Sequence, residues 1–121
     1  MDIYQFEKVA GKKITRFGSD FNMAKIVDAQ GSIHIGMMFL GENGLIGEHE
    51  AVVPQLFLVI QGEGWVYGAG KERMKITAGE AAFWHKGESH SSGTESGLTA
   101  LVIESDALDP QAIMAKLKIK E

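Results

Sequence analysis

The chain has 121 residues and a mass of 13.2 kDa, which is the size of one compact domain. Its 12 Lys and Arg against 16 Asp and Glu leave a net charge of −4, so it lacks the basic surface that nucleic-acid binding requires. The sequence contains no cysteine, which excludes disulfides, thiolate zinc sites and cysteine nucleophiles and leaves His, Asp, Glu and Gln as potential metal ligands.

The hydropathy of the chain gives no sign of a targeting or membrane segment. The N-terminal residues contain no apolar stretch of the kind that forms a secretory signal. The longest apolar run covers residues 56–60, far short of the roughly 20 residues needed to cross a bilayer. We therefore expect a cytoplasmic protein with no membrane or nucleic-acid partner.

Glycine is the residue that organises the pattern. Fifteen glycines are spread along the chain against two prolines, and the runs between them are rich in β-branched and aromatic residues. This pattern predicts an all-β fold of short strands and tight turns. The predicted strands cover residues 32–40, 55–60, 80–84 and 98–103. A sharp turn at residues 62–64 is expected to start a hairpin.

Side-chain alternation assigns the faces of these strands. In the first strand, one face carries Ile33, Ile35, Met37 and Phe39, and the other carries His34, Gly36, Met38 and Leu40. Residues 55–60 are apolar on both faces after the first, so this strand should lie buried between two layers. Trp65 and Tyr67 are expected on the outer face or at a subunit contact. Two sheets closing over each other, as a sandwich or small barrel, would bury such strands.

The C-terminal residues have the features of one short helix, over about residues 109–119. Asp109 is an N-cap residue, and Pro110 suits the first helical position. Three apolar residues then recur at helical spacing, namely Ile113, Met114 and Leu117. We expect this helix to cover apolar barrel surface or a partner subunit.

Common catalytic motifs are incomplete in this chain. His49 and Glu50 begin the zinc-protease pattern H-E-x-x-H, but Val53 stands where the second His belongs. Ser89 and His90 are adjacent, so in a strand they point to opposite faces and cannot form a nucleophile–base pair.

Two glycine-anchored blocks remain, and the first covers residues 47–64. It resembles the first motif of the cupin superfamily, G-x5-H-x-H-x(3,4)-E-x6-G. His49 takes the place of the first His and Ala51 that of the second. Gln55 takes the place of the Glu, and Gly62 follows after the required six residues.

The second block covers residues 79–94 and resembles the second cupin motif, G-x5-P-x-G-x2-H-x3-N. The matched positions are Gly79, Gly87 and His90, and the replaced positions are His85 for Pro and Thr94 for Asn. The resemblance implies an antiparallel double-stranded β-helix, or jelly-roll barrel, over about residues 20–105. It also implies one central pocket and a homodimer.

The resemblance implies a site at His49, Gln55 and His90. Cupins that bind metal use three His and one Glu, whereas here Ala51 cannot coordinate and Gln55 offers a neutral amide oxygen. Two imidazoles and an amide could still hold a divalent ion such as Zn, Ni, Mn or Fe. The alternative is a polar pocket in which the two histidines hydrogen-bond to Gln55.

The walls of the expected pocket are apolar. Phe57 and Val59 continue the inward alternation from Gln55, and Trp84 lies just before the turn of the second motif. Such a pocket suits a small organic ligand with a carboxylate, carbonyl or hydroxyl group.

Three functions are compatible with these residues. The first is a binding module for a small organic ligand. The second is a metal-dependent dioxygenase, isomerase or lyase that uses His49, Gln55 and His90. The third is a metal-free sugar epimerase-like catalyst with a His base, since an ordinary histidine titrates near pH 6.5. The sequence does not decide whether the protein is an enzyme.

Overall fold

Short alternating runs of apolar and polar residues form the strands, and most turns between them contain glycine. The computed structural model describes residues 1–110 and 118–120. Its strands are β1 (Asp2–Gln5), β2 (Lys12–Ile14), β3 (Phe21–Met23), β4 (His34–Leu40), β5 (Leu45–Glu50), β6 (Gln55–Tyr67), β7 (Met74–Thr77), β8 (Glu80–Trp84), β9 (Ser89–Gly93), β10 (Leu98–Glu104) and β11 (Lys118–Lys120). The described part also contains two short 3-10 turns, η1 (Lys8–Ala10) and η2 (Arg16–Gly18).

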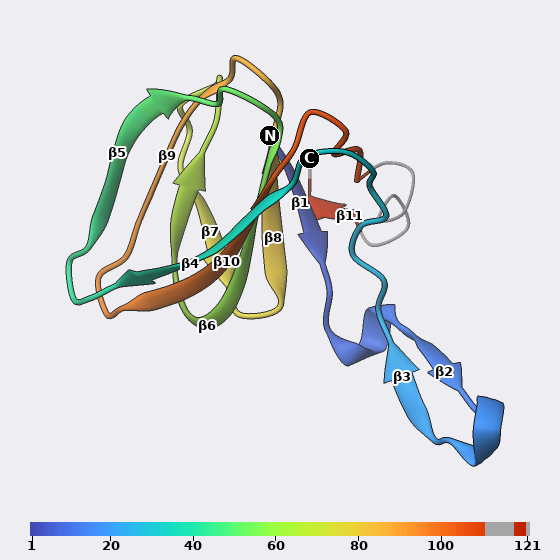
Figure 1. Cartoon of the computed structure of the whole chain (residues 1–121). Coiled ribbons are helices and arrows are strands. Elements are labelled where there is room, and N and C mark those ends of the chain that lie inside the picture. Colours follow the sequence, from blue (N-terminus) through green and yellow to red (C-terminus); the bar gives the residue numbers. More distant parts are fainter. Residues whose placement is uncertain (111–117, 121) are drawn as a thin grey trace.

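The strands form two antiparallel layers that close into a barrel (Figure 1). The larger layer has the strand order β11–β1–β8–β6–β10–β4. The facing layer has the order β5–β9–β6–β7, because the far half of β6 leaves the larger layer to pair with β9 and β7. The predicted all-β jelly-roll barrel is therefore confirmed.

The predicted hairpin at residues 62–64 is wrong. Strand β6 runs through these residues without reversing, and it bends from one layer into the other. Ile60 has no partner on β10, because Val59 pairs with Ala100 and the register then shifts by one residue. Gly62 has a φ of +84°, and a Cβ there would collide with the carbonyl oxygen of Gly97. The glycines therefore bend the strand at a crowded crossing.

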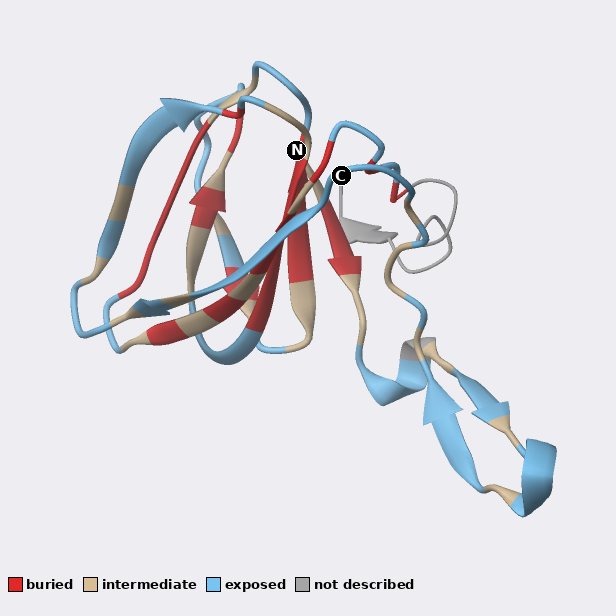
Figure 2. Cartoon of the chain, viewed as in Figure 1, coloured by how far each residue is buried: buried red, intermediate tan, exposed pale blue. Residues whose placement is uncertain are grey.

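Strand β6 separates two apolar clusters, as its predicted burial on both faces requires. The buried residues, red in Figure 2, gather in the strands of the barrel. The cluster inside the barrel includes Phe57, Val59, Trp84, Ala100 and Val102. The cluster on the outer face of the larger layer includes Leu56, Leu58, Phe83, Ile103 and Leu108. The predicted burial holds up to Val59, and Ile60 is exposed.

The predicted C-terminal helix, over about residues 109–119, is wrong for its last residues. Residues 111–117 lie outside the described residues, and Lys118–Lys120 form β11, which pairs with β1. This pairing supplies partners to backbone groups that β1 would otherwise expose at the edge of the sheet. Among the described residues, no helix is long and apolar enough to span a membrane.

Residues 8–23 form an arm that extends away from the barrel (Figure 1). The arm contains η1, β2, η2 and β3, and the two strands pair with each other through Lys12↔Met23 and Ile14↔Phe21. A two-stranded hairpin of this length is only marginally stable by itself in water.

Candidate functional site

One row of side chains crosses four strands of the larger layer. On the strands in spatial order, His34 pairs with Glu104, Glu104 with Gln55, and Gln55 with Trp84; each pair is a direct cross-strand neighbour. Cross-strand partners point to the same face of a sheet. Trp84 packs inside the barrel against Phe57, with ring centroids 5.7 Å apart, so the whole row faces the barrel interior.

A pair of histidines from the facing layer meets this row. His49 on β5 and His90 on β9 are cross-strand partners, and their ring centroids lie 4.4 Å apart. His90 also stacks on Trp84, with a centroid distance of 4.3 Å and an interplanar angle of 27°. His90 is 2% exposed, whereas His49 is exposed at the surface. The second layer thus brings one buried and one accessible imidazole to the row.

The hydrogen bonds of both rings define which nitrogen is free. The Nδ1 atom of His49 lies 2.8 Å from the carbonyl oxygen of Gly47, and that of His90 lies 3.0 Å from the carbonyl oxygen of Glu88. A carbonyl oxygen can only accept, so in each neutral ring Nδ1 carries the proton and Nε2 carries a lone pair. The Nε2 atom of His90 is buried and has no hydrogen-bond partner in the described part of the chain.

Burial lowers the pKa of His90 below its ordinary value of about 6.5. The hydrogen bond to the Glu88 carbonyl opposes this shift, the neighbouring His49 adds to it, and the carboxylate of Glu104 weakly opposes it. His90 is therefore neutral at pH 7. The lone pair on its buried Nε2 can accept a hydrogen bond or bind a metal ion.

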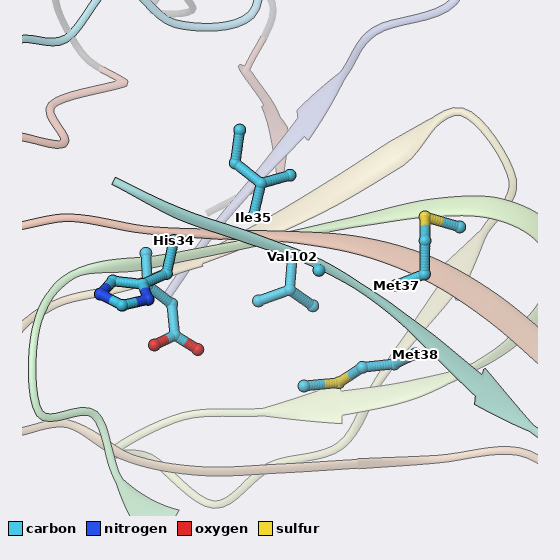
Figure 3. A pocket seen from close by; sticks show the side chains of 7 residues that line it. His34, Ile35, Met37, Met38 and Val102 are labelled. Atoms are coloured by element: carbon cyan, nitrogen blue, oxygen red, sulfur yellow. The ribbon is translucent and has the colours of Figure 1, made fainter. Parts of the chain in front are cut away.

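A cavity of about 210 Å³ opens beside the row, under the edge strand β4 (Figure 3). Its lining residues are His34, Ile35, Gly36, Met37, Met38, Val102 and Glu104. Figure 3 shows His34, Met38 and Val102 on one side of β4, with Ile35 and Met37 on the other. A Cβ at Gly36 would meet no atom within 4 Å, so the cavity includes the space that a side chain there would fill.

The structure brings most of the predicted pocket residues together, with some differences in role. Trp84 lies against His90, and Gln55 lies next to Trp84 on the neighbouring strand. The side-chain amide of Gln55, a residue 6% exposed, makes no hydrogen bond within the described residues, so the expected bond to the histidines is not formed. Phe57 and Val59 are packed inside the barrel core.

Two residues of the row, Glu104 and His34, were not identified as site residues from the sequence. Only the register of β10 against its neighbouring strands identifies them, because it aligns Glu104 with both Gln55 and His34. Alternation alone places Glu104 on the inward face with Val102, but only the pairing shows that it stands beside Gln55. His85 lies outside the site, since its exposed ring is 3.8 Å from the Asp2 carboxylate.

The donor set fits a metal ion only in part. Among the described residues, no three His, Asp or Glu side chains are gathered closely enough to hold one. The two free Nε2 atoms of His49 and His90 are the ligands that a divalent ion would use, and their Nδ1 bonds fix the required tautomer. Gln55, the cross-strand neighbour of Trp84, carries an amide oxygen that is the third candidate donor.

Comparisons with known proteins support the fold. No protein family and no curated protein matches the sequence. Among solved structures, a cupin superfamily protein from Desulfitobacterium hafniense is 14% identical, with a TM-score of 0.58 over 70% of this chain and 75% of that one. An RmlC-like cupin from Shewanella frigidimarina is 19% identical, with a TM-score of 0.58 over 64% of this chain and 68% of that one.

A third structure is more similar in sequence. It is a putative ethanolamine utilization protein Q from Salmonella typhimurium, 27% identical, with a TM-score of 0.55. The match covers 64% of this chain and 61% of that protein, so it leaves more than a third of the longer protein unmatched.

Proposed function

We propose that this chain, which shares the fold of its cupin structural neighbours, binds a small hydroxyl-bearing organic ligand at His49, Gln55 and His90. The observation that carries this proposal is the buried Nε2 atom of His90, which has no partner among the described residues. Buried polar atoms in proteins are nearly always hydrogen-bonded. A ligand hydroxyl would donate to this lone pair, and the Gln55 amide would bind a second polar atom of the ligand.

The surroundings favour an organic molecule over a free ion. Trp84 forms a flat aromatic wall against His90, and the cavity beneath β4 offers apolar surface from Met38 and Val102. Small-molecule sites combine such walls with a few directed polar groups. Ethanolamine, after which one structural neighbour is named, is itself a small hydroxyl compound and belongs to the proposed class.

The test follows the ring nitrogens of His90 by long-range ¹H–¹⁵N NMR while small hydroxy, keto and carboxylic compounds are added. A hydroxyl compound that binds should shift the Nε2 resonance of His90, and the shift should be absent in Gln55→Leu. The matched control is His85→Gln, which removes an exposed imidazole outside the site and should leave binding intact. If no compound of the set moves the His90 resonances, this proposal is wrong.

A second candidate is a metal site at His49, Gln55 and His90, favoured by the two free Nε2 lone pairs. When bound there, a divalent ion such as Zn, Ni, Mn or Fe would supply Lewis-acid chemistry. The protein residues would orient the ligand, and Trp84 would exclude water from one side. Elemental analysis of untagged protein tests this candidate. Metal near one ion per chain, lost in His90→Ala and kept in His85→Ala, would support it, whereas no metal after incubation with excess ions would reject it.

A further inference from the structure

The row and the two histidines that face it carry three hydrogen-bond acceptors. Glu104 lines the cavity and its carboxylate accepts, and the free lone pairs of His49 and His90 accept at the Trp84 end of the row. Glu104 has no hydrogen bond or ion pair within the described residues, and neither Lys nor Arg lines the cavity. A ligand would therefore meet an excess of acceptors and one negative charge.

We propose that the ligand is a small hydroxylated amine, whose ammonium group pairs with Glu104 and whose hydroxyl donates to His90. This inference rests on the proposed function and specifies the charge of its ligand. Glu104 and Gln55 are direct neighbours in the row, and Gln55 is in turn the neighbour of Trp84, which stacks on His90. A carboxylate ligand would face Glu104 with like charge and meet neither Lys nor Arg in the cavity lining.

Three probes of nearly equal size distinguish the effect of the ligand's charge from that of its hydroxyl group. They are ethanolamine, ethylene glycol and glycolate. Molecules this small bind with dissociation constants of about millimolar at best. NMR titration should show ethanolamine binding about tenfold more tightly than ethylene glycol, because a charge-assisted hydrogen bond replaces a neutral one. Glycolate should bind most weakly.

The variant Glu104→Gln tests which residue selects the charge. It should bind ethanolamine and ethylene glycol equally, whereas Glu42→Gln, a change at an exposed turn, should keep the tenfold preference. If glycolate binds wild-type protein as well as ethanolamine does, the charge assignment is wrong while the proposed site stands. If none of the three probes shifts the His90 resonances, both proposals are rejected.

A second, independent inference concerns the arm of residues 8–23. Its apolar side chains point to solvent, with Val9 78%, Phe17 100%, Phe21 44% and Met23 48% exposed. Phe17 stands at the tip in the left-handed region, with a φ of 59°, a conformation that non-glycine residues rarely adopt. The arm also contains an exposed ion pair between Lys13 and Asp20.

The edge strand β4 presents a matching surface. Its outer face carries three exposed apolar side chains, Ile35, Met37 and Phe39, and Ile33 just before the strand is exposed as well. One edge of β4 pairs with β10, and the described residues provide no partner for the other edge. Natural proteins usually protect an unpaired strand edge from unwanted pairing. An unpaired edge next to an exposed apolar face therefore indicates a contact surface.

The arm and the rest of the chain also carry opposite net charges. The arm carries four Lys or Arg and one Asp, a net charge of +3, whereas the rest of the chain carries eight basic and fifteen acidic residues, a net charge of −7. Glu42 and Glu95 lie near the Leu40 end of β4, where the backbone N–H of Asn43 donates to the Glu95 carbonyl. A homodimer is what the cupin resemblance implies, and we infer which surfaces form its contact: the arm of one copy docks against the β4 face of the second copy, and the contact is reciprocal.

Light scattering coupled to size-exclusion chromatography tests this dimer at micromolar concentration. Wild-type protein should be a dimer, and Phe39→Lys should shift it to monomer because it places a charge opposite the basic arm. Val52→Lys is the matched control, since Val52 is 84% exposed and lies outside both surfaces. Phe17→Ser should weaken the dimer from the other side of the contact. A monomeric wild type, or a dimer unaffected by both Phe variants, would overturn the inference.

Discussion

His90 lies against Trp84 with 4.3 Å between ring centroids, while its Nδ1 donates to the Glu88 carbonyl. These two contacts hold the imidazole in one orientation and one tautomer. One face of the His90 ring packs on Trp84, and Nε2 is the ring nitrogen that has no hydrogen-bond partner among the described residues. A buried imidazole held in this way is preorganised to accept a hydrogen bond, which is the property that the proposed ligand site depends on.

The first prediction concerns the protonation of His90. Burial lowers its pKa, and Glu104 opposes that shift, so Glu104→Gln should lower the pKa further. Titration of the ring by NMR measures both values. The control Glu42→Gln changes an exposed carboxylate near the other end of β4 and should leave the His90 titration unchanged. A His90 midpoint at or above 6.5 in wild-type protein would contradict the burial argument.

The same shift makes stability depend on pH. Because the folded-state pKa of His90 is below the unfolded value of about 6.5, the unfolded chain binds more protons between the two values. This contribution to the free energy of unfolding is fully present above pH 6.5 and is lost as the pH falls through the folded pKa. Urea unfolding at several pH values should show a smaller loss in His90→Phe, which keeps an aromatic ring against Trp84.

The cavity predicts the effect of a side chain at position 36. Gly36→Val should fill open space, since a Cβ there meets no atom within 4 Å. The thermal midpoint should be unchanged or higher, because valine favours strands and glycine weakens them. Binding of the hydroxyl probes should fall more than tenfold if the cavity admits the ligand. Gly41→Val, just beyond the end of the same strand, has equal open space and should leave binding intact.

Strand positions and faces could be predicted from the sequence because they depend on local alternation. The predicted strand at residues 80–84 is β8, and residues 98–103 lie within β10. The inward row of polar residues could not be predicted, because it depends on register. A shift of one residue between β10 and β6 would remove Glu104 from Gln55, and neither strand alone specifies the alignment.

The course of β6 shows the same limit. Gly62 and Gly64 have the composition of a turn, yet the strand continues because β7 and β9 pair with its far half. Glycine is needed at Gly62 for a crowded crossing with Gly97, a contact between segments far apart in the sequence. Local turn composition therefore predicted a reversal where tertiary pairing produces a bend.

Thr94 is predicted to stabilise the turn that connects β9 to β10. Its buried hydroxyl donates to the Glu63 carbonyl at 2.6 Å and accepts from the Gly97 N–H at 3.0 Å. Thr94→Val keeps the shape but leaves both backbone groups without this partner, so the free energy of unfolding should fall by about 2–3 kcal/mol. Thr94→Ser keeps the hydroxyl and should lose less than half of that in urea unfolding. Equal losses in the two variants would mean that packing of the methyl group dominates.

Glu88 is predicted to hold the turn that leads into His90. Its carboxylate accepts from the N–H groups of Ala69 and His85, at 2.9 and 3.0 Å, and from the amino group of Met1 at 3.0 Å. Burial alone would raise the pKa of Glu88, but these three donors outweigh it and hold the pKa below its ordinary value. The resulting stability is present above about pH 4.3, the unfolded pKa, and is lost as the pH falls through the folded pKa.

Replacing this carboxylate should affect both stability and the site. Glu88→Gln should lower the free energy of unfolding at pH 7 by about 1–3 kcal/mol, because hydrogen bonds to a charged group are among the stronger ones. The difference from wild type should shrink below pH 4, where the wild-type carboxyl is also neutral. Glu72→Gln, at an exposed position in the loop before β7, is the control and should cost almost nothing at either pH. Because the Glu88 carbonyl accepts from His90, Glu88→Gln should also broaden or shift the His90 ring resonances, and an unchanged spectrum would show that the backbone holds the turn without the carboxylate.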